Sequence, residues 1–154
     1  MKKLAAVGLL AALLLPAQLA TKKTLTLDAA KKIAAAAEAE AKKNNWNVVI
    51  AIVDDGANLV YLQKMDGVQN GSLNVAQAKA RGAINFKRPT KAMEDALAGG
   101  RQAILSLPGA MPVEGGLPLM NGNDMIGAIG VSGVTSQQDG QIAAAGVAAA
   151  AAMK

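Results

Sequence analysis

The sequence predicts an α+β domain, in which helices pack on an antiparallel sheet. Two hairpin signals indicate the sheet, and each consists of two strand-like segments around a turn. Alanine-rich segments with apolar residues at helical spacing precede, separate and follow these hairpins. The expected order is therefore helix, hairpin, helices, hairpin, helix.

The first twenty residues have the layout of a secretory signal peptide. Lys2 and Lys3 form a basic start, and Leu4–Leu15 is an apolar run that is too short to span a bilayer. A buried N-terminal helix is the alternative interpretation. We expect cleavage after Ala20, which leaves residues 21–154 as a single periplasmic or secreted domain.

The first helix and the first hairpin follow this segment. Thr26 is placed to cap a helix over Asp28–Lys43, whose buried face is nearly all alanine. Val48–Val53 is a continuous β-branched and apolar run, which is typical of a central strand covered on both faces. A turn at residues 54–58 then returns the chain as a second strand over Leu59–Met65.

The middle of the chain predicts short helices. We expect Ser72 to cap a helix that reaches about Asn85. The segment Phe86–Pro89 breaks this helix, because a proline disfavours a helical residue before it. Thr90 then caps a second helix through Ala98, whereas the type of the short element over Arg101–Leu107 stays open.

The segment from Met111 to Asp139 is rich in glycine. Glycine is unfavourable inside strands, so such a cluster usually marks backbone that another group approaches closely. A packed helix, a neighbouring subunit and a ligand are the three candidates. A spacing of GxxGxxG, without a parallel βαβ unit around it, excludes a dinucleotide site of the Rossmann type.

The same segment contains the second hairpin and the start of the last helix. Strands are expected over Leu117–Met120 and Asp124–Val131, and Pro118 places the first of them at a sheet edge or at a bulge. Ser136 and Asp139 form a capping-box pattern that opens a final helix running almost to the end of the chain.

Composition excludes several classes of function. The chain of 154 residues has 16 basic and 11 acidic side chains, and loss of Lys2 and Lys3 lowers its formal charge from +5 to +3. With three aromatic residues besides, we expect no nucleic-acid partner. The chain has neither cysteine nor histidine, which excludes disulfides, histidine-dependent catalytic triads and imidazole ligation of a metal. No catalytic residue is assigned, and a binding protein is favoured over an enzyme.

Two segments are the candidates for ligand binding. Phe86, Lys87, Arg88 and Thr90 place positive charge beside an aromatic ring at a helix break, where arginine could pair with a ligand's carboxylate. A solvated loop anchored by Phe86 is the alternative.

The second candidate is Glu114 with Gly115 and Gly116, where an acid lies in compact apolar sequence. An exposed loop acid is the alternative. Met65 and Met111 are candidate thioether metal ligands, although ordinary core packing explains each of them as well.

Several strings resemble the GlcG/HbpS family of small haem-binding proteins: VVIAIVDDGANLVYLQKMDG, KARGAINFKRPT, PVEGGLPL and GAIGVSGVTSQQD. The likeness extends over roughly Leu25 to Ala150. It implies a profilin-like fold with a five-stranded antiparallel sheet, assembly into homo-oligomers from dimers to octamers, and binding of haem. Membership of a family indicates fold more securely than function.

Together with the signal-peptide layout of residues 1–20, the resemblance predicts an exported haem- or tetrapyrrole-binding protein with no membrane span, and it implies a role in haem or iron handling. Because histidine is absent, the iron would need another ligand, such as Met65, Met111, Tyr61, Lys87 or Thr90, or the haem would be held mainly by burial and by contacts with its propionates. Lys87 and Arg88 would meet the propionates. The alternative is a binding protein or weak enzyme for a small organic acid such as glycolate. In a third, structural interpretation, the glycine-rich segment is only a subunit interface.

Overall fold

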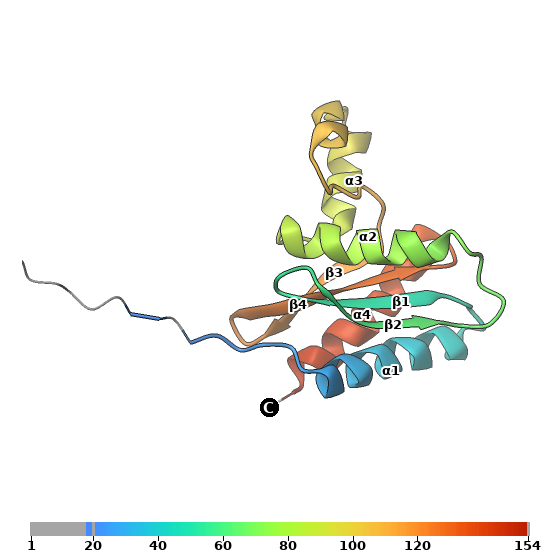
Figure 1. Cartoon of the computed structure of the whole chain (residues 1–154). Helices are drawn as coiled ribbons and strands as arrows, with labels where there is room; N and C mark the ends of the chain where they lie inside the picture. Colours follow the sequence, from blue (N-terminus) through green and yellow to red (C-terminus); the bar gives the residue numbers. More distant parts are fainter. Residues whose placement is uncertain (1–17, 20, 154) are drawn as a thin grey trace, which may run out of the picture.

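The computed structural model describes residues 18–19 and 21–153 and confirms an α+β domain (Figure 1). The predicted signal peptide lies almost entirely outside these residues. In chain order, the elements are α1 (Leu27–Lys43), β1 (Val49–Asp54), β2 (Leu59–Lys64), α2 (Ser72–Asn85), α3 (Thr90–Ala98), the 3-10 helix η1 (Gln102–Ser106), β3 (Gly116–Asn121), β4 (Asp124–Ser132) and α4 (Ser136–Ala151).

The sheet has four antiparallel strands in the order β2-β1-β4-β3. The prediction of five strands is therefore wrong for the described part of the chain, in which no further segment pairs with the edge strands β2 and β3. The segment Arg101–Leu107, whose type stayed open, contains η1 instead of a strand. Pro118 lies on the edge strand β3 as expected, next to a bulge after Leu119.

Helices cover both faces of the sheet, and β1 is buried between them. Alternate residues of β1 point to opposite faces, so Ile50 and Ile52 pack with α1 and α4, whereas Ala51 and Val53 pack under α2. Figure 1 shows α2 on one face, α1 and α4 on the other, and α3 standing away from the α2 layer. We call α3, η1, the chain between them and the following Leu107 the arm (residues 90–107).

The helix starts differ from the predictions at three places. Thr26 caps α1 as expected. Ser72 does not cap α2, because it is the first helical residue and its hydroxyl accepts a hydrogen bond from Ser132 instead. Thr90 likewise begins α3 behind Pro89, and the capping box of α4 uses Thr135 with Gln138 rather than Ser136 with Asp139.

The glycines of the second hairpin are approached from within the chain. An added Cβ at Gly130 would lie 2.0 Å from the carbonyl oxygen of Ala76 and 2.5 Å from the amide nitrogen of Ala80, both on α2. The backbone of α2 therefore lies directly on β4. Of the three candidates for the approaching group, a packed helix is the one observed at this glycine.

None of the helices in the described residues has both the length and the hydropathy that crossing a membrane requires.

We expect Gly130→Ala to lower the free energy of unfolding by about 1–3 kcal/mol or more, because the new methyl group would overlap the backbone of α2. Urea denaturation measures this change. Gly71→Ala is the matched control, since open space surrounds its Cβ position and an effect within about 0.5 kcal/mol is expected. Equal stabilities of the two variants would contradict close packing of α2 on β4.

Candidate functional site

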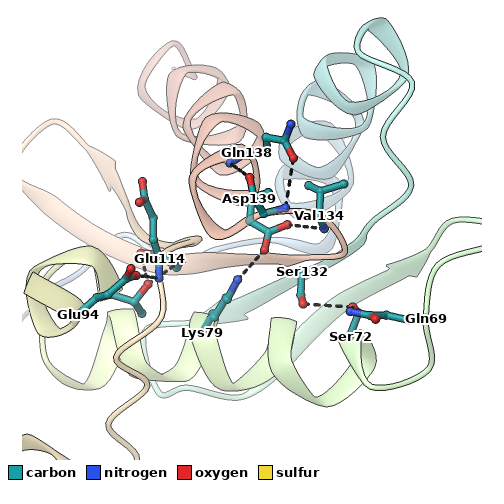
Figure 2. Close-up of polar contacts among 12 residues, drawn as sticks. Gln69, Ser72, Lys79, Glu94, Glu114, Ser132, Val134, Gln138 and Asp139 are labelled. Atoms are coloured by element: carbon teal, nitrogen blue, oxygen red, sulfur yellow. Dashed lines mark hydrogen bonds and ion pairs between the residues drawn. The ribbon is translucent and has the colours of Figure 1, made fainter. Parts of the chain in front are cut away.

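A buried ion pair joins the two helices that lie on opposite faces of the sheet (Figure 2). Lys79 Nζ of α2 lies 2.7 Å from Asp139 Oδ2 of α4, and the two residues are 1% and 2% exposed. Asp139 Oδ1 also accepts a hydrogen bond from the amide of Val134 at 3.2 Å. Burial raises the pKa of Asp139, while its hydrogen bond to Lys79 opposes this rise.

The chain between the arm and β3 runs directly beside this pair. Gly115 has a φ of +121°, and an added Cβ there would lie 2.8 Å from Asp139 Cβ and 2.9 Å from Lys79 Nζ. At Gly116, it would lie 2.3 Å from the carbonyl oxygen of Lys79. Both glycines therefore allow close packing around the ion pair.

Thr90 connects the basic loop to β3. Its side chain is fully buried, and its hydroxyl oxygen accepts a hydrogen bond from the amide of Gly116 at 2.9 Å. The two predicted segments therefore meet at this point. This hydrogen bond satisfies the buried hydroxyl of Thr90.

Glu114 presents a buried carboxylate oxygen that lacks a partner. Its Oε2 atom has no hydrogen bond with any described residue, and its side chain packs against Gly140, where an added Cβ would lie 2.6 Å from Oε1. Its amide donates to a carboxylate oxygen of Glu94 on α3. A buried carboxylate oxygen without a hydrogen bond is unfavourable, so a proton or a ligand's donor would stabilise this position.

The surroundings of Glu114 contain further acids, together with the lysine that these acids keep charged. The carboxylate of Asp95 raises the pKa of the exposed Lys91 through a hydrogen bond, and Glu94 and Glu114 add to the same direction. This position therefore suits a cationic or protonated group better than an organic anion.

The basic loop divides its side chains between two different cavities. Phe86 and Arg88 line a cavity of about 150 Å³ at the base of the arm. The remaining lining residues come from α3, η1 and the chain beside η1: Ala92, Met93, Ala96, Arg101, Ile104 and Leu107. Lys87 has a φ of +51° and lines a separate cavity between the two hairpin turns.

The two methionines proposed as metal ligands lie apart. Met65 follows β2, packs against the core on the α1 and α4 side, and lines a third cavity of about 420 Å³. Met111 lies against α2, where an added Cβ at Gly82 would be 3.2 Å from its own Cβ. The described residues contain no cluster of three or more His, Cys, Asp or Glu side chains suited to a metal ion.

Sequence reasoning missed Lys79, Met93 and Arg101. One signal for Lys79 was available. This lysine lies on the apolar face of a predicted helix, and a charge on a buried face needs a partner. Met93 and Arg101 carried no such signal, since the cavity that they line forms only when η1 folds back on α3.

Comparison with known proteins identifies relatives over nearly the whole domain. A family model described as "Haem degrading protein HbpS-like" matches residues 25–148. Protein GlcG of Escherichia coli K12 is 41% identical over 112 residues, which cover 73% of this chain and 84% of GlcG. An uncharacterized 15.0 kDa protein of Citrobacter freundii is 38% identical over 120 residues, or 75% of this chain and 84% of that protein.

Solved structures show the same fold. The Klebsiella pneumoniae protein ORFY is 31% identical, with a TM-score of 0.84 over 91% of this chain and 99% of ORFY. A double mutant of Streptomyces reticuli HbpS is 32% identical, with a TM-score of 0.77 over 90% and 97% of the two chains. A complex of PduOC with haem is 25% identical, with a TM-score of 0.75 over 82% and 95%.

We expect Lys79→Met and Asp139→Asn each to lower the free energy of unfolding by roughly 3–5 kcal/mol, because either change leaves one buried group without its partner. The double variant should lose less than the sum, with a coupling on the order of 1–3 kcal/mol. Chemical denaturation of all four proteins measures this coupling. Breaking the exposed Lys42–Glu38 pair with Lys42→Met is the control, with an expected effect of about 0.5 kcal/mol or less. Additive losses would contradict an energetic link between Lys79 and Asp139.

Proposed function

The chain belongs to the HbpS-like/GlcG family, and from this membership we propose that it is an exported protein that binds haem or a related tetrapyrrole. The description of the family model names haem degradation, and one structural relative was solved as a complex with haem. The basic start and apolar run of the first twenty residues support the proposal of export.

The cavity at the base of the arm is the observation that carries this proposal. Its walls are largely apolar, with Phe86, Met93 and Ile104 among them, as the ring of a tetrapyrrole requires. Arg88 and Arg101 line the same cavity and are both exposed. Guanidinium groups bind carboxylates in a bidentate manner, so we assign the propionates to these two arginines, with Arg101 in the place first proposed for Lys87.

The residues present fit one edge of the macrocycle. The cavity measures about 150 Å³. Pockets that enclose small ligands span about 300–1,000 Å³, so most of the ring would lie outside it. Leu105 and Leu107 are 65% and 43% exposed on the arm and would cover part of one ring face. The same exposed apolar surface supports the proposal of homo-oligomers from dimers to octamers.

Met93 is the thioether that lines this cavity, and it is almost fully buried. We therefore propose that Met93 would be the residue that offers a thioether to the iron, in preference to Met65 and Met111, neither of which lines the cavity. Bound haem would supply a redox-active iron, and the chain's own part is to bind the propionates, hold the ring edge and exclude water from it. The proposed role is binding rather than catalysis.

Titration of the protein with hemin tests this function. We expect a saturable Soret change, and a loss of affinity of about tenfold or more in the Arg88→Met, Arg101→Met double variant, because both propionate contacts are removed. Met93→Leu should alter the visible spectrum of the complex. Arg81→Met is the matched control, since Arg81 is an exposed arginine of α2 that does not line the cavity. A titration without saturation would overturn the proposal.

The small volume of the same cavity favours a second candidate, a protein that binds a small organic acid such as glycolate. Two arginines beside about 150 Å³ of space suit a compact carboxylate without any change in the arm. The sequence pattern predicted that Glu114 belongs to the organic-acid site, but Glu114 does not line this cavity.

This candidate predicts that glycolate raises the melting temperature and that hemin does not. Differential scanning fluorimetry with each ligand, on the protein and on its Arg88→Met, Arg101→Met variant, distinguishes the two functions. The stabilisation by glycolate should disappear in the variant. If glycolate stabilised the protein and its double variant equally, it would bind outside the arm cavity.

A further inference from the structure

A second cavity, of about 470 Å³, is lined by Lys87 of the basic loop. It is bounded by the turn after β1, the turn between β3 and β4, and the C-terminal end of α2, and it shares no residue with the arm cavity. Its volume falls within the range of about 300–1,000 Å³ that is typical of small-molecule sites. Neither candidate function uses it.

The walls of this cavity carry charges of both signs. Asp55 from the first turn and Asp124 from the second supply carboxylates, and Asn123 adds an amide. Lys87 supplies an ammonium group from the end of α2. The Nζ atom of Lys87 lies more than 4.0 Å from either carboxylate, so the cavity separates its own positive and negative groups.

The backbone around Lys87 holds it at this position. Its φ of +51° closes the end of α2, and its amide donates a hydrogen bond of 3.2 Å to the carbonyl oxygen of Ile84. The left-handed conformation and this hydrogen bond place the side chain of Lys87 at the cavity, away from the one that its neighbours Phe86 and Arg88 line.

The floor between the charges is apolar. Met120 of β3 and Met125 of β4 are register partners, so their side chains lie on the same face of the sheet. Ile84 of α2 completes this floor. Methionine side chains adapt to ligands of different shape, so the floor suits a short aliphatic chain.

From these groups we propose that the cavity binds a small zwitterion, which is a molecule with an ammonium and a carboxylate group on a short aliphatic skeleton, such as an α-amino acid. Its carboxylate pairs with Lys87, its ammonium with Asp55 and Asp124, and its aliphatic part lies on the two methionines. A simple anion would face the two aspartates, and a simple amine would face Lys87. Only a ligand with both charges gives Lys87 and the two aspartates a partner of opposite charge.

Two lysines that precede α1 already pair with the carboxylates of this cavity, although neither lysine lines it. Lys22 pairs with Asp55, and Lys23 lies 3.7 Å from Asp124. Both lysines are more than half exposed, so their pairing is weak and a bound ammonium group can replace it. Loss of Lys22 should therefore increase the affinity for a ligand that uses Asp55.

Isothermal titration with three probes of matched chain length tests the proposal. Norleucine carries both charges, hexanoate lacks the ammonium, and pentylamine lacks the carboxylate. We expect saturable binding of norleucine, and affinities for the other two that are weaker by about tenfold or more. Equal affinity for all three probes, or no binding of norleucine, would overturn the proposal.

Variants then identify the groups involved. Lys87→Met and Asp55→Asn should each weaken norleucine binding by about tenfold, and Lys22→Met should strengthen it. Lys64→Met is the control, because Lys64 is exposed and lines a different cavity. Unchanged affinity in Lys87→Met and Asp55→Asn, with binding retained, would overturn the assignment of the cavity. The hemin titration is read separately, since this site stands whether or not haem binds at the arm.

Discussion

The ion pair between Lys79 and Asp139 is the constraint on which the rest of this structure depends. It links α2 and α4, which cover opposite faces of the sheet, through two charged groups that are almost entirely removed from water. Such a pair is stable only when both partners are present and their remaining hydrogen-bonding atoms are satisfied. The neighbouring backbone must therefore approach without side chains, which is the role of Gly115 and Gly116.

This packing also positions the base of the arm. Because Gly116 lies against the backbone of Lys79, its amide is held where the hydroxyl of Thr90 accepts a hydrogen bond from it. Thr90 is the first residue of α3, so the start of the arm is tied to the edge strand β3. The position of the cavity that Arg88 and Arg101 line therefore depends on a chain of contacts that starts at the buried ion pair.

Local patterns were sufficient to predict most of the fold. The β-branched run of β1, the turn of the second hairpin and the alanine face of α1 each express a periodicity that the final structure keeps. The helix caps were predicted less well. Asp139 stands at a position that suits a capping box, but Lys79, 60 residues away, recruits its carboxylate, and Thr135 caps the helix instead.

The candidate site was only partly predictable, for the same reason. Phe86, Arg88 and Thr90 belong to one loop, so their proximity follows from the sequence. Their partners Arg101 and Gly116 come from distant segments, and no local rule connects them. The five-stranded sheet came from the family resemblance alone, which describes relatives and does not fix the number of strands in one member.

The arm has a consequence for the dynamics of the molecule. Beyond the hydrogen bond at Thr90, α3 makes similarly small contacts with η1, α2 and β3, while Leu105 and Leu107 are exposed. A segment with so little buried apolar surface opens locally at a far lower free energy than the core. Partial unfolding of the arm would therefore open its cavity to solvent, while the sheet and the helices on both its faces stay intact.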